Sequence, residues 1–372
     1  MRIGIDAKWY FTGPVSTRVV LQNLLPELFS LYPEHEWHIL LDKRDRHLHF
    51  PFSGSNIHTG YIWADNNMLS NLLLVPGWLR RSKAEVMLFQ TFPSIKHDIP
   101  SIAFIHDVLF RRFPRFFSWK ERLYFLPLSW LTRNRADRLI ATTEFVAGEL
   151  LTYHYTRDRS RIDIVPLGVN EKYMPELSQD RARLSGVKEK FNLPDRYILY
   201  VGRLNVRKNI ENLLRALPLL RDKGAKLVIV GKEDWKASDL HDLVSMPAIR
   251  ERITMTGAMD DEDLVAVYCL AKIFCFPSMA EGFGLPPLEA MASGVPVIVS
   301  KTTSLPEVCG DAAVYIDPAQ PESIARAIDE LLGDEGLYAR KRRSGLERAG
   351  QYTWTATAQA LMRSIKNTTK NR

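Results

Sequence analysis

Cysteine is scarce in this chain of 372 residues: Cys269, Cys275 and Cys309 are an odd number, and they lack the spacing of a metal motif. This usage argues against a disulfide scaffold and favours the reducing cytosol. The chain also lacks any apolar run near the ~20 residues that a membrane span needs. Its first residues, MRIGIDAKWY, predict a strand instead of a secretory signal. We therefore expect a cytoplasmic protein that does not span the membrane.

Metal-ligand and dinucleotide-binding patterns are missing as well. The histidines form no HxxxH pattern and one HxH pair, His47 and His49, which lies in a charged segment. The acidic run DDED at 260–263 is similar to a metal-binding loop, but it precedes a predicted helix, where acids interact favourably with the N-terminal dipole. No GxGxxG follows a predicted strand, which disfavours an NAD-dependent oxidoreductase. The prediction is that the protein binds no metal and no dinucleotide cofactor.

The charge of the chain is positive, with a formal value of +7 and a pI near 9.2. Such a balance suggests an anionic partner, and acidic lipid, nucleic acid and phosphorylated small molecules all fit. A basic surface without a dedicated partner stays open as an alternative. Nucleic acid is the poorest of these partners, because no RNA- or DNA-binding motif accompanies the charge.

Short β-branched runs alternate with longer helical patterns, which indicates an α/β protein built from parallel units. The runs form two rows. The first row of strands is predicted at 2–6, 37–42, 86–89, 102–107, 138–143 and 162–166, and the second at 197–202, 226–231, 253–257, 273–278, 295–300 and 312–317.

A polar segment without a strand pattern, 167–196, separates the two rows. It predicts two Rossmann-like, doubly wound domains, at 1–170 and 171–352. An amphipathic C-terminal helix, within 353–372, is expected to pack back on the first domain. Two such domains that face each other form a cleft, and ligands of open parallel sheets bind at the carboxyl ends of the strands.

The segment RLNVRKN follows one of these predicted strand ends. Asn209 is expected to cap the next helix through its side chain, and Glu211 falls in the first turn of that helix, where its dipole favours an acid. Arg203 and Lys208 beside a helix N-terminus suit a diphosphate, because Arg can bind two oxygens and Lys adds a mobile charge. A solvated basic turn is the alternative.

The segment AEGFGLPPLEAM places Glu281 on a loop and Glu289 inside a helix, since Pro286 or Pro287 suits the first helical turn. Gly294 is the expected stop of this helix. Carboxylates that share acid–base work in glycosidases stand ~5–9.5 Å apart, and a loop-then-helix spacing does not suit such a pair. The two glutamates are better explained as contacts to one elongated ligand, which the glycines let the backbone approach.

These segments together resemble the retaining glycosyltransferases of family 4, which have the GT-B fold and a Glu-x7-Glu motif. The likeness rests on VGRLNVRKN, EGFGLPPLEAM and SLPEVCGDAAVYIDP in the second half, and on RIGIDA, FIHDVLFRRFP, ADRLIATTEF and IVPLGVN in the first. It covers most of the chain. The resemblance implies that a nucleotide diphosphate sugar is the donor and that no metal is needed.

The resemblance also implies the role of each site residue. Arg203 and Lys208 would hold the donor diphosphate, Glu289 the ribose, and Glu281 the hydroxyls of the sugar. His106 would face the donor sugar and, with Glu281, Arg203 and Lys208, form the catalytic set. The remaining donor contacts would come from Gly257 near the base and from Gly282, Phe283, Gly284 and Leu285.

The first domain departs from the family pattern in TGPVSTRVV, which lacks the usual Gly-x-Gly before the first helix. Gly13 is the one glycine there, and Pro14 removes an N–H donor. Gly13 or Ser16 is expected to reach the phosphate or the acceptor. Asp107 has two open interpretations, a contact to the acceptor or a structural cap.

Arginines and lysines alternate with aromatics at 110–133. This pattern fits contact with an anionic membrane surface or a lipid-linked acceptor. It fits equally a helix that packs its aromatics inward and leaves its cations outside.

The predicted function is transfer of a hexose, with retention and without a metal, to a hydroxyl of a glycan or lipid-linked glycan. The first-domain segments look most like bacterial mannosyl- and rhamnosyltransferases of surface polysaccharides. GDP-mannose is therefore the first choice of donor, while UDP-glucose, UDP-N-acetylglucosamine and a dTDP-deoxysugar stay open. The alternative from another class is a non-catalytic scaffold that binds a sugar nucleotide. The expected location is the cytoplasm, and association with the cytoplasmic face of the membrane stays open.

Overall fold

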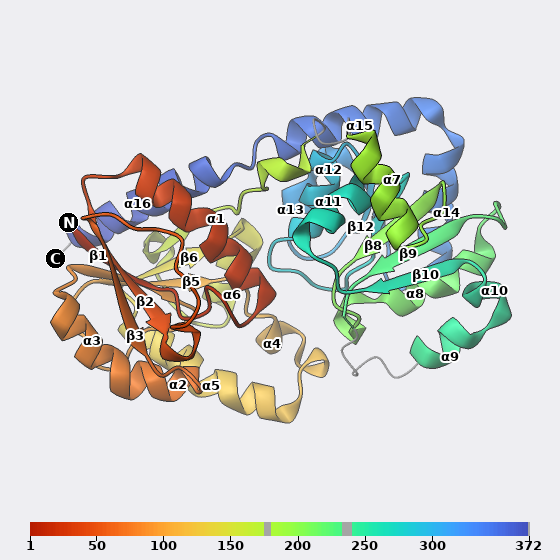
Figure 1. The fold of residues 1–372 in the computed structure, drawn as a ribbon. Coiled ribbons are helices and arrows are strands. Elements are labelled where there is room, and N and C mark those ends of the chain that lie inside the picture. Colours follow the sequence, from red (N-terminus) through yellow and green to blue (C-terminus); the bar gives the residue numbers. More distant parts are fainter. Residues whose placement is uncertain (175–179, 233–239, 371–372) are drawn as a thin grey trace. The chain divides into compact units, whose positions relative to one another are not determined.

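The computed structural model describes residues 1–174, 180–232 and 240–370 (Figure 1). The chain divides into two compact units. Unit 1 comprises Met1–Gly168 and Thr353–Arg372, and unit 2 comprises Val169–Tyr352. The border lies two residues before the expected one. Most of the expected connection belongs to unit 2, where it includes helix α7 (Arg181–Lys190). Its residues 175–179, and 371–372 of the C-terminal segment, lie outside the described residues.

Unit 1 is built on a parallel seven-stranded sheet of order β3-β2-β1-β4-β5-β6-β7, counted over the described residues. Its strands are β1 (Arg2–Asp6), β2 (Glu36–Asp42), β3 (Ile57–Ile62), β4 (Val86–Gln90), β5 (Ser101–Ile105), β6 (Arg138–Ala141) and β7 (Ile162–Ile164). Strand β3 is absent from the sequence prediction. Its sequence IHTGYI is polar and contains a glycine, and as an edge strand it is largely solvent-accessible, so it lacks the apolar run of the other strands.

Helices connect these strands and lie on both faces of the sheet (Figure 1). They are α1 (Val15–Leu31), α2 (Asn67–Leu69), the π-helical turn η2 (Ser70–Leu74), α3 (Val75–Ser82), α4 (Leu109–Arg112), α5 (Trp119–Arg135), α6 (Glu144–Thr152) and α16 (Trp354–Lys370), with short 3-10 turns η1 (Lys43–Asp45), η3 (Pro114–Phe116) and η4 (Arg159–Arg161). The C-terminal α16 packs on α1, where Thr355 Oγ1 donates to Glu27 Oε2 over 2.7 Å.

Unit 2 is built on a parallel sheet of order β10-β9-β8-β11-β12-β13 within the described residues. Its strands are β8 (Tyr197–Val201), β9 (Lys226–Val230), β10 (Ile253–Gly257), β11 (Ile273–Phe276), β12 (Val297–Ser300) and β13 (Ala313–Ile316). Its remaining helices are α8 (Ile210–Ala216), α9 (Leu240–Ser245), α10 (Pro247–Arg250), α11 (Asp261–Leu270), α12 (Leu285–Ala292), α13 (Leu305–Cys309), α14 (Pro321–Gly333) and α15 (Glu335–Ala349), with 3-10 turns η5 (Glu171–Tyr173), η7 (Val206–Lys208), η8 (Leu217–Leu219) and η9 (Gly310–Ala312).

Each sheet has a point where the strand order reverses, between β1 and β4 in unit 1 and between β8 and β11 in unit 2. The loops that leave the two strands at such a point run in opposite directions and open a crevice at the carboxyl edge of the sheet. The central strands themselves are buried along their length. The loops after β1 and β4 in unit 1, and after β8 and β11 in unit 2, are therefore the places where sheets of this kind bind ligands.

Candidate functional site

The loops after β8 and β11 are bound to each other at the switch point of unit 2. The backbone N–H of Met279 donates to the carbonyl of Arg207 over 2.8 Å, and Ser278 Oγ lies 3.3 Å from the same carbonyl. The short turn η7 brings Lys208 to this position, and Asn205 caps the turn by accepting from the Lys208 N–H. Basic and acidic segments that are far apart in the sequence thus meet at one strand edge.

Glu281 is the centre of this meeting point. Its carboxylate accepts from Lys208 Nζ over 2.6 Å and from the Ser278 hydroxyl, and it lies 3.2 Å from Arg207 Nη1. Glu281 is 7% exposed. Burial alone would raise the pKa of its carboxyl, but Lys208 and Arg207 outweigh that effect and lower the pKa to about 2. Glu281 is therefore a carboxylate at every physiological pH.

The backbone on either side of Glu281 is fixed by hydroxyl groups from the loop after β12. Thr303 Oγ1 accepts from the Glu281 N–H over 3.0 Å, and Ser304 Oγ lies 2.9 Å from the carbonyls of both Glu281 and Phe283. Gly284 has φ +113°, a conformation that L side chains rarely adopt, and a Cβ there would lie 2.7 Å from Leu305. The turn into α12 therefore requires glycine.

Glu289 lies on α12, in a different environment. Tyr268 donates to its Oε2 over 2.9 Å. Burial raises the pKa of Glu289 to about 7, and Tyr173 contributes a second phenol hydrogen bond to the same carboxyl. The two glutamates of the segment therefore differ electrostatically: Glu281 is held charged by cations, whereas Glu289 changes its charge near neutral pH.

The structure also locates the helix ends that the sequence predicted. Pro286 falls in the first turn of α12, and Gly294 follows its last turn with φ +72°. The expected side-chain cap at Asn209 is wrong. Asn209 does precede α8, but it adopts φ +57° and its amide donates to the carbonyls of Pro277 and Pro318. Its side-chain NH2 group thus ties three loops together, and its side chain makes no cap hydrogen bond to α8.

Two further predicted donor contacts lie at strand ends in unit 2. Arg203 is exposed and follows β8 by two residues. Gly257 ends β10, and its carbonyl accepts from the Gly231 N–H over 2.9 Å. The acidic run at 260–263 begins α11, where Asp260 caps the helix by accepting from the Asp263 N–H. The run therefore has the structural role that the sequence favoured for it.

His106 lies in unit 1, directly after β5, because that strand is shorter than predicted. It borders a cavity of about 340 Å³ whose walls are largely aromatic, including Phe110 and Tyr124. Burial lowers the pKa of His106 to about 4, so the ring is neutral, and its Nε2 has no hydrogen-bond partner among the described residues. The Asp107 carboxylate accepts from the N–H of Leu109, the first residue of α4, over 3.1 Å. This contact corresponds to the structural alternative for Asp107.

A second cavity in unit 1, of about 500 Å³, shares Trp9 and Tyr124 with the first. Its lining is polar and comes from the ends of β1, β2 and β3: Thr12, Gly13, Arg44, Asp65, Asn66 and Asn67. Asn67 is 7% exposed, and neither atom of its amide has a partner within the described chain. A buried amide without partners is unfavourable unless a ligand or water completes it. Ser16 lines the first cavity instead.

Comparison with known proteins identifies the family. Residues 185–349 match the family described as Glycosyl transferases group 1, and residues 23–173 match Glycosyltransferase Family 4. The O-antigen chain mannosyltransferase B of Escherichia coli is 34% identical over 260 residues, which make up 68% of this chain and 67% of that protein. The chain belongs to glycosyltransferase family 4. Serotype-specific mannosyltransferase WbdA of Escherichia coli is 33% identical over 60% of this chain, which spans only 28% of WbdA.

Solved structures agree on the fold of this family 4 chain. Sucrose-phosphate synthase from Thermosynechococcus elongatus has a TM-score of 0.78 at 20% identity and covers 99% of this chain and 98% of its own. Anabaena HepE in complex with UDP and glucose has a TM-score of 0.76 at 15% identity, over 99% of this chain and 100% of its own. The GT-B fold, with two Rossmann-like α/β domains, is confirmed.

Several polar contacts that the structure shows within each unit were not indicated by the sequence. Arg207 stands inside the quoted VGRLNVRKN, but only the contact to Glu281 distinguishes it from any surface arginine. Ser278 and Tyr268 contact the two glutamates, and neither carries a pattern of its own. Lys8 was missed as well: it is 2% exposed and pairs with Asp6 over 3.0 Å at the end of β1.

Proposed function

We propose that this family 4 chain transfers a hexose, with mannose from GDP-mannose as first choice, to a hydroxyl of a glycan. The transfer would proceed with retention and without a metal. Lys208, Arg207 and Glu281 at the switch point of unit 2 carry the proposal, because this is where open sheets bind ligands. The Escherichia coli relatives that are named mannosyltransferases support the choice of sugar.

The charged side chains at the switch point of unit 2 suit a nucleotide diphosphate sugar. Arg203, Arg207 and Lys208 are three cations and Glu281 is one carboxylate, which leaves a net charge of +2. That balance neutralises a diphosphate with one negative charge on each phosphate. Glu281 would accept hydrogen bonds from hydroxyls of the sugar while it holds the two cations in place. Glu289 would bind the ribose hydroxyls, and Gly257 and the backbone of 282–285 would line the rest of the site.

In the transfer, the acceptor oxygen bonds to the anomeric carbon on the face from which the diphosphate leaves. The carbon–oxygen bond to the diphosphate breaks, and the proton of the acceptor hydroxyl passes to the departing diphosphate. Lys208, Arg207 and Arg203 stabilise the negative charge that develops on the leaving group. His106, as a neutral ring, would donate or accept one hydrogen bond from the sugar and would carry no charge.

The acceptor would bind in unit 1, in the polar cavity beside the His106 cavity. Trp9 and Tyr124 offer aromatic faces on which a sugar ring can stack, and the unpartnered amide of Asn67 can pair with hydroxyls. Arg44 and Asp65, which are 2.8 Å apart, add a charged donor and acceptor. A ligand with many hydroxyl groups satisfies this mixture of aromatic and polar groups.

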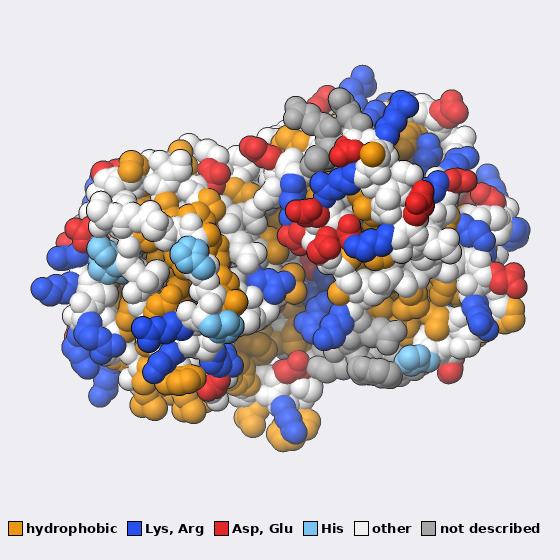
Figure 2. All heavy atoms as spheres, in the orientation of Figure 1, with side chains coloured by type: hydrophobic (Ala, Val, Ile, Leu, Met, Phe, Trp, Pro, Cys, Tyr) orange, Lys and Arg blue, Asp and Glu red, His pale blue; other side chains and the backbone are white. Residues whose placement is uncertain are grey.

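A lipid-linked acceptor would require that unit 1 rest on the cytoplasmic face of a membrane, and helix α5 supports that proposal. Trp119, Leu123, Leu126 and Trp130 repeat with helical spacing and are 68%, 62%, 43% and 61% exposed. Leu73 of the neighbouring η2 is 71% exposed. Hydrophobic side chains gather along the lower edge of the face in Figure 2, where Figure 1 places α2 and α5. Among the described residues, no helix is long and apolar enough to cross a membrane.

The membrane proposal is tested by sedimentation with vesicles. Wild type should bind phosphatidylglycerol vesicles more strongly than phosphatidylcholine vesicles, because Lys120, Arg122 and Arg133 flank the apolar stripe of α5. The double variant Trp119→Ser, Trp130→Ser should lose binding, whereas Trp63→Ser, also exposed, serves as the matched control. Equal binding of both variants would contradict the role of α5.

The donor is tested by thermal shift against GDP-, UDP-, dTDP- and ADP-sugars. A ligand supplied well above its Kd should stabilise the protein by ~2–4 kcal/mol. The sugar nucleotide that stabilises wild type should fail to stabilise Lys208→Ala, while Lys223→Ala, an exposed lysine of unit 2, should respond as wild type does. A response to none of the four would contradict donor binding.

The non-catalytic scaffold is the second candidate, since it would share every donor contact. Release of free sugar or transfer to an acceptor from the identified donor distinguishes the two. If release continues unchanged in Glu281→Ala, the activity belongs to a contaminant and the scaffold is favoured.

A further inference from the structure

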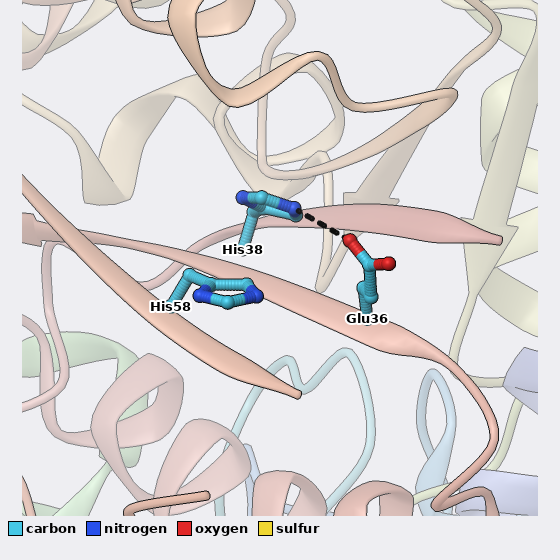
Figure 3. Close-up of side chains that lie close together, drawn as sticks. All are labelled: Glu36, His38 and His58. Carbon is cyan, nitrogen blue, oxygen red and sulfur yellow. Dashed lines mark ion pairs between the residues drawn. The ribbon is translucent and has the colours of Figure 1, made fainter. Parts of the chain in front are cut away.

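Two histidines and a glutamate meet on strands β2 and β3 of unit 1 (Figure 3). His38 and His58 are register partners on the two parallel strands, and their ring centroids lie 4.9 Å apart. Glu36 precedes His38 by two residues and so lies on the same face of the strand, with Oε2 at 3.8 Å from His38 Nε2. One ligand atom from each side chain lies within 4.8 Å of the other two.

In this cluster one buried nitrogen has a long ion-pair contact in place of a hydrogen bond. Nε2 of His38 is buried and forms no hydrogen bond to any described residue. Such an atom is unfavourable unless something completes it. Glu36 and His58 are exposed, so both side chains can turn toward the buried nitrogen.

We propose that Glu36, His38 and His58 bind a divalent cation of the zinc class, with water as the remaining ligand. Two imidazoles and one carboxylate form a donor set that Zn²⁺ accepts. Bond lengths of ~2.0–2.2 Å place tetrahedral ligand atoms roughly 3.4 Å apart. The three atoms, now within 4.8 Å of one another, must therefore approach by up to about 1.4 Å, which rotation of two exposed side chains can supply.

The place of the site in the sheet indicates what the cation does. Glu36 begins β2, and His58 is the second residue of β3, so the site is at the amino-terminal edge of the sheet. The His106 cavity and the polar cavity beside it lie at the opposite, carboxyl edge. β3 is the edge strand, and a cation would join it to β2. The positive charge of Arg2 acts on His38, but Arg2 also forms an ion pair with Glu85, with 3.6 Å between Nη2 and Oε1. The cation would stabilise unit 1 and take no part in sugar transfer.

Zinc titration of the untagged, metal-free protein tests the site. One Zn²⁺ should bind per chain, and at roughly 100-fold above its Kd should raise the thermal midpoint by about 5 °C. His58→Ala and Glu36→Gln should each weaken binding at least ~10-fold. His47→Ala, which removes an exposed histidine of unit 1 outside the cluster, should bind as wild type does.

Cobalt adds a readout that a nonspecific surface histidine does not give. Co²⁺ in the site should produce the intense visible bands of a tetrahedral or five-coordinate ion, and these should vanish in His58→Ala. The proposal is overturned if wild type binds no stoichiometric Zn²⁺, or if His58→Ala retains its affinity and the Co²⁺ bands. Because the readouts are binding and stability, the result does not depend on the proposed transferase activity.

Discussion

Lys208 and Glu281, 73 residues apart in the sequence, form an ion pair of 2.6 Å at the carboxyl edge of the unit 2 sheet. Their side chains are 12% and 10% exposed, so little water screens the pair. The family resemblance implies a separate role for each residue, Lys208 on the diphosphate and Glu281 on the sugar. In the structure each holds the other, so the proposed donor would meet the two side chains as one polar unit.

Removal of Lys208 is expected to destabilise the protein. Lys208→Met leaves the Glu281 carboxylate buried with Arg207 as its remaining cation, which should lower the free energy of unfolding by about 2–4 kcal/mol. Addition of Glu281→Gln should recover part of that loss, because the unpaired charge is then gone. Urea unfolding of the four proteins measures the coupling. Strict additivity of the two substitutions would contradict the ion pair, and Lys223→Met should change stability by less than ~0.5 kcal/mol.

Glu289 should make stability depend on pH near neutrality. Its pKa is raised to about 7 in the folded protein, against 4.5 for an ordinary glutamate. A raised pKa stabilises the folded state below the unfolded value, and this contribution is lost as the pH rises through 7. Wild type should therefore lose on the order of 1–3 kcal/mol between pH 4.5 and 8 relative to Glu289→Gln. If the free energies of unfolding of the two proteins change equally with pH over that range, the raised pKa of Glu289 is refuted.

Arg207 should be required as arginine, not merely as a cation. Its Nη1 contacts both the Glu281 carboxylate and the carbonyl of Ala280. The rigid, planar guanidinium holds this nitrogen in a fixed direction, whereas lysine carries one mobile ammonium on a flexible chain. Arg207→Lys should lower kcat/KM for the identified donor roughly 10-fold, which corresponds to ~1.4 kcal/mol. Arg215→Lys, on α8, is the matched substitution and should leave kcat/KM unchanged.

His106 should act as a neutral ring. With a pKa of about 4, it does not titrate between pH 5 and 8. His106→Gln, which keeps hydrogen-bonding capacity, should lower kcat by up to ~100-fold if the ring contacts the reacting sugar. The shape of the pH–rate profile should stay the same between pH 5 and 8. Loss of an inflection near 6.5 in the variant would show that His106 is charged during the reaction.

Asn67 should contribute to acceptor binding and not to donor binding. Saturation-transfer NMR with methyl α-mannoside as probe should give a signal with wild type that falls several-fold in Asn67→Ala, because the sugar loses a buried amide partner. The thermal shift with the donor should not change. Asn134→Ala, an exposed residue of α5, is the control. An undiminished signal in Asn67→Ala would show that the acceptor binds elsewhere.

The sequence alone determined the fold and the chemical character of the donor segments. Apolar runs such as YILYVG at 197–202 form strands because a parallel sheet buries them on both faces, and this is a local property that can be read in order. The edge strand β3 was not predicted, because a strand exposed at the edge of a sheet does not need an apolar run. The ends of helix α12 were also predicted from local signals, since Pro286 suits a first helical turn and Gly294 accepts a positive φ.

Only the tertiary structure decided which side chains meet. Arg207 and Glu281 come together only because β8 and β11 are neighbours in the sheet, and neither segment by itself predicts the contact. The opposite pKa shifts of Glu281 and Glu289 depend on burial and on partners from distant segments. His38 and His58 likewise become neighbours through strand register alone. Motifs specify residue types and local backbone, whereas charge state and coordination arise from contacts that the sheet creates.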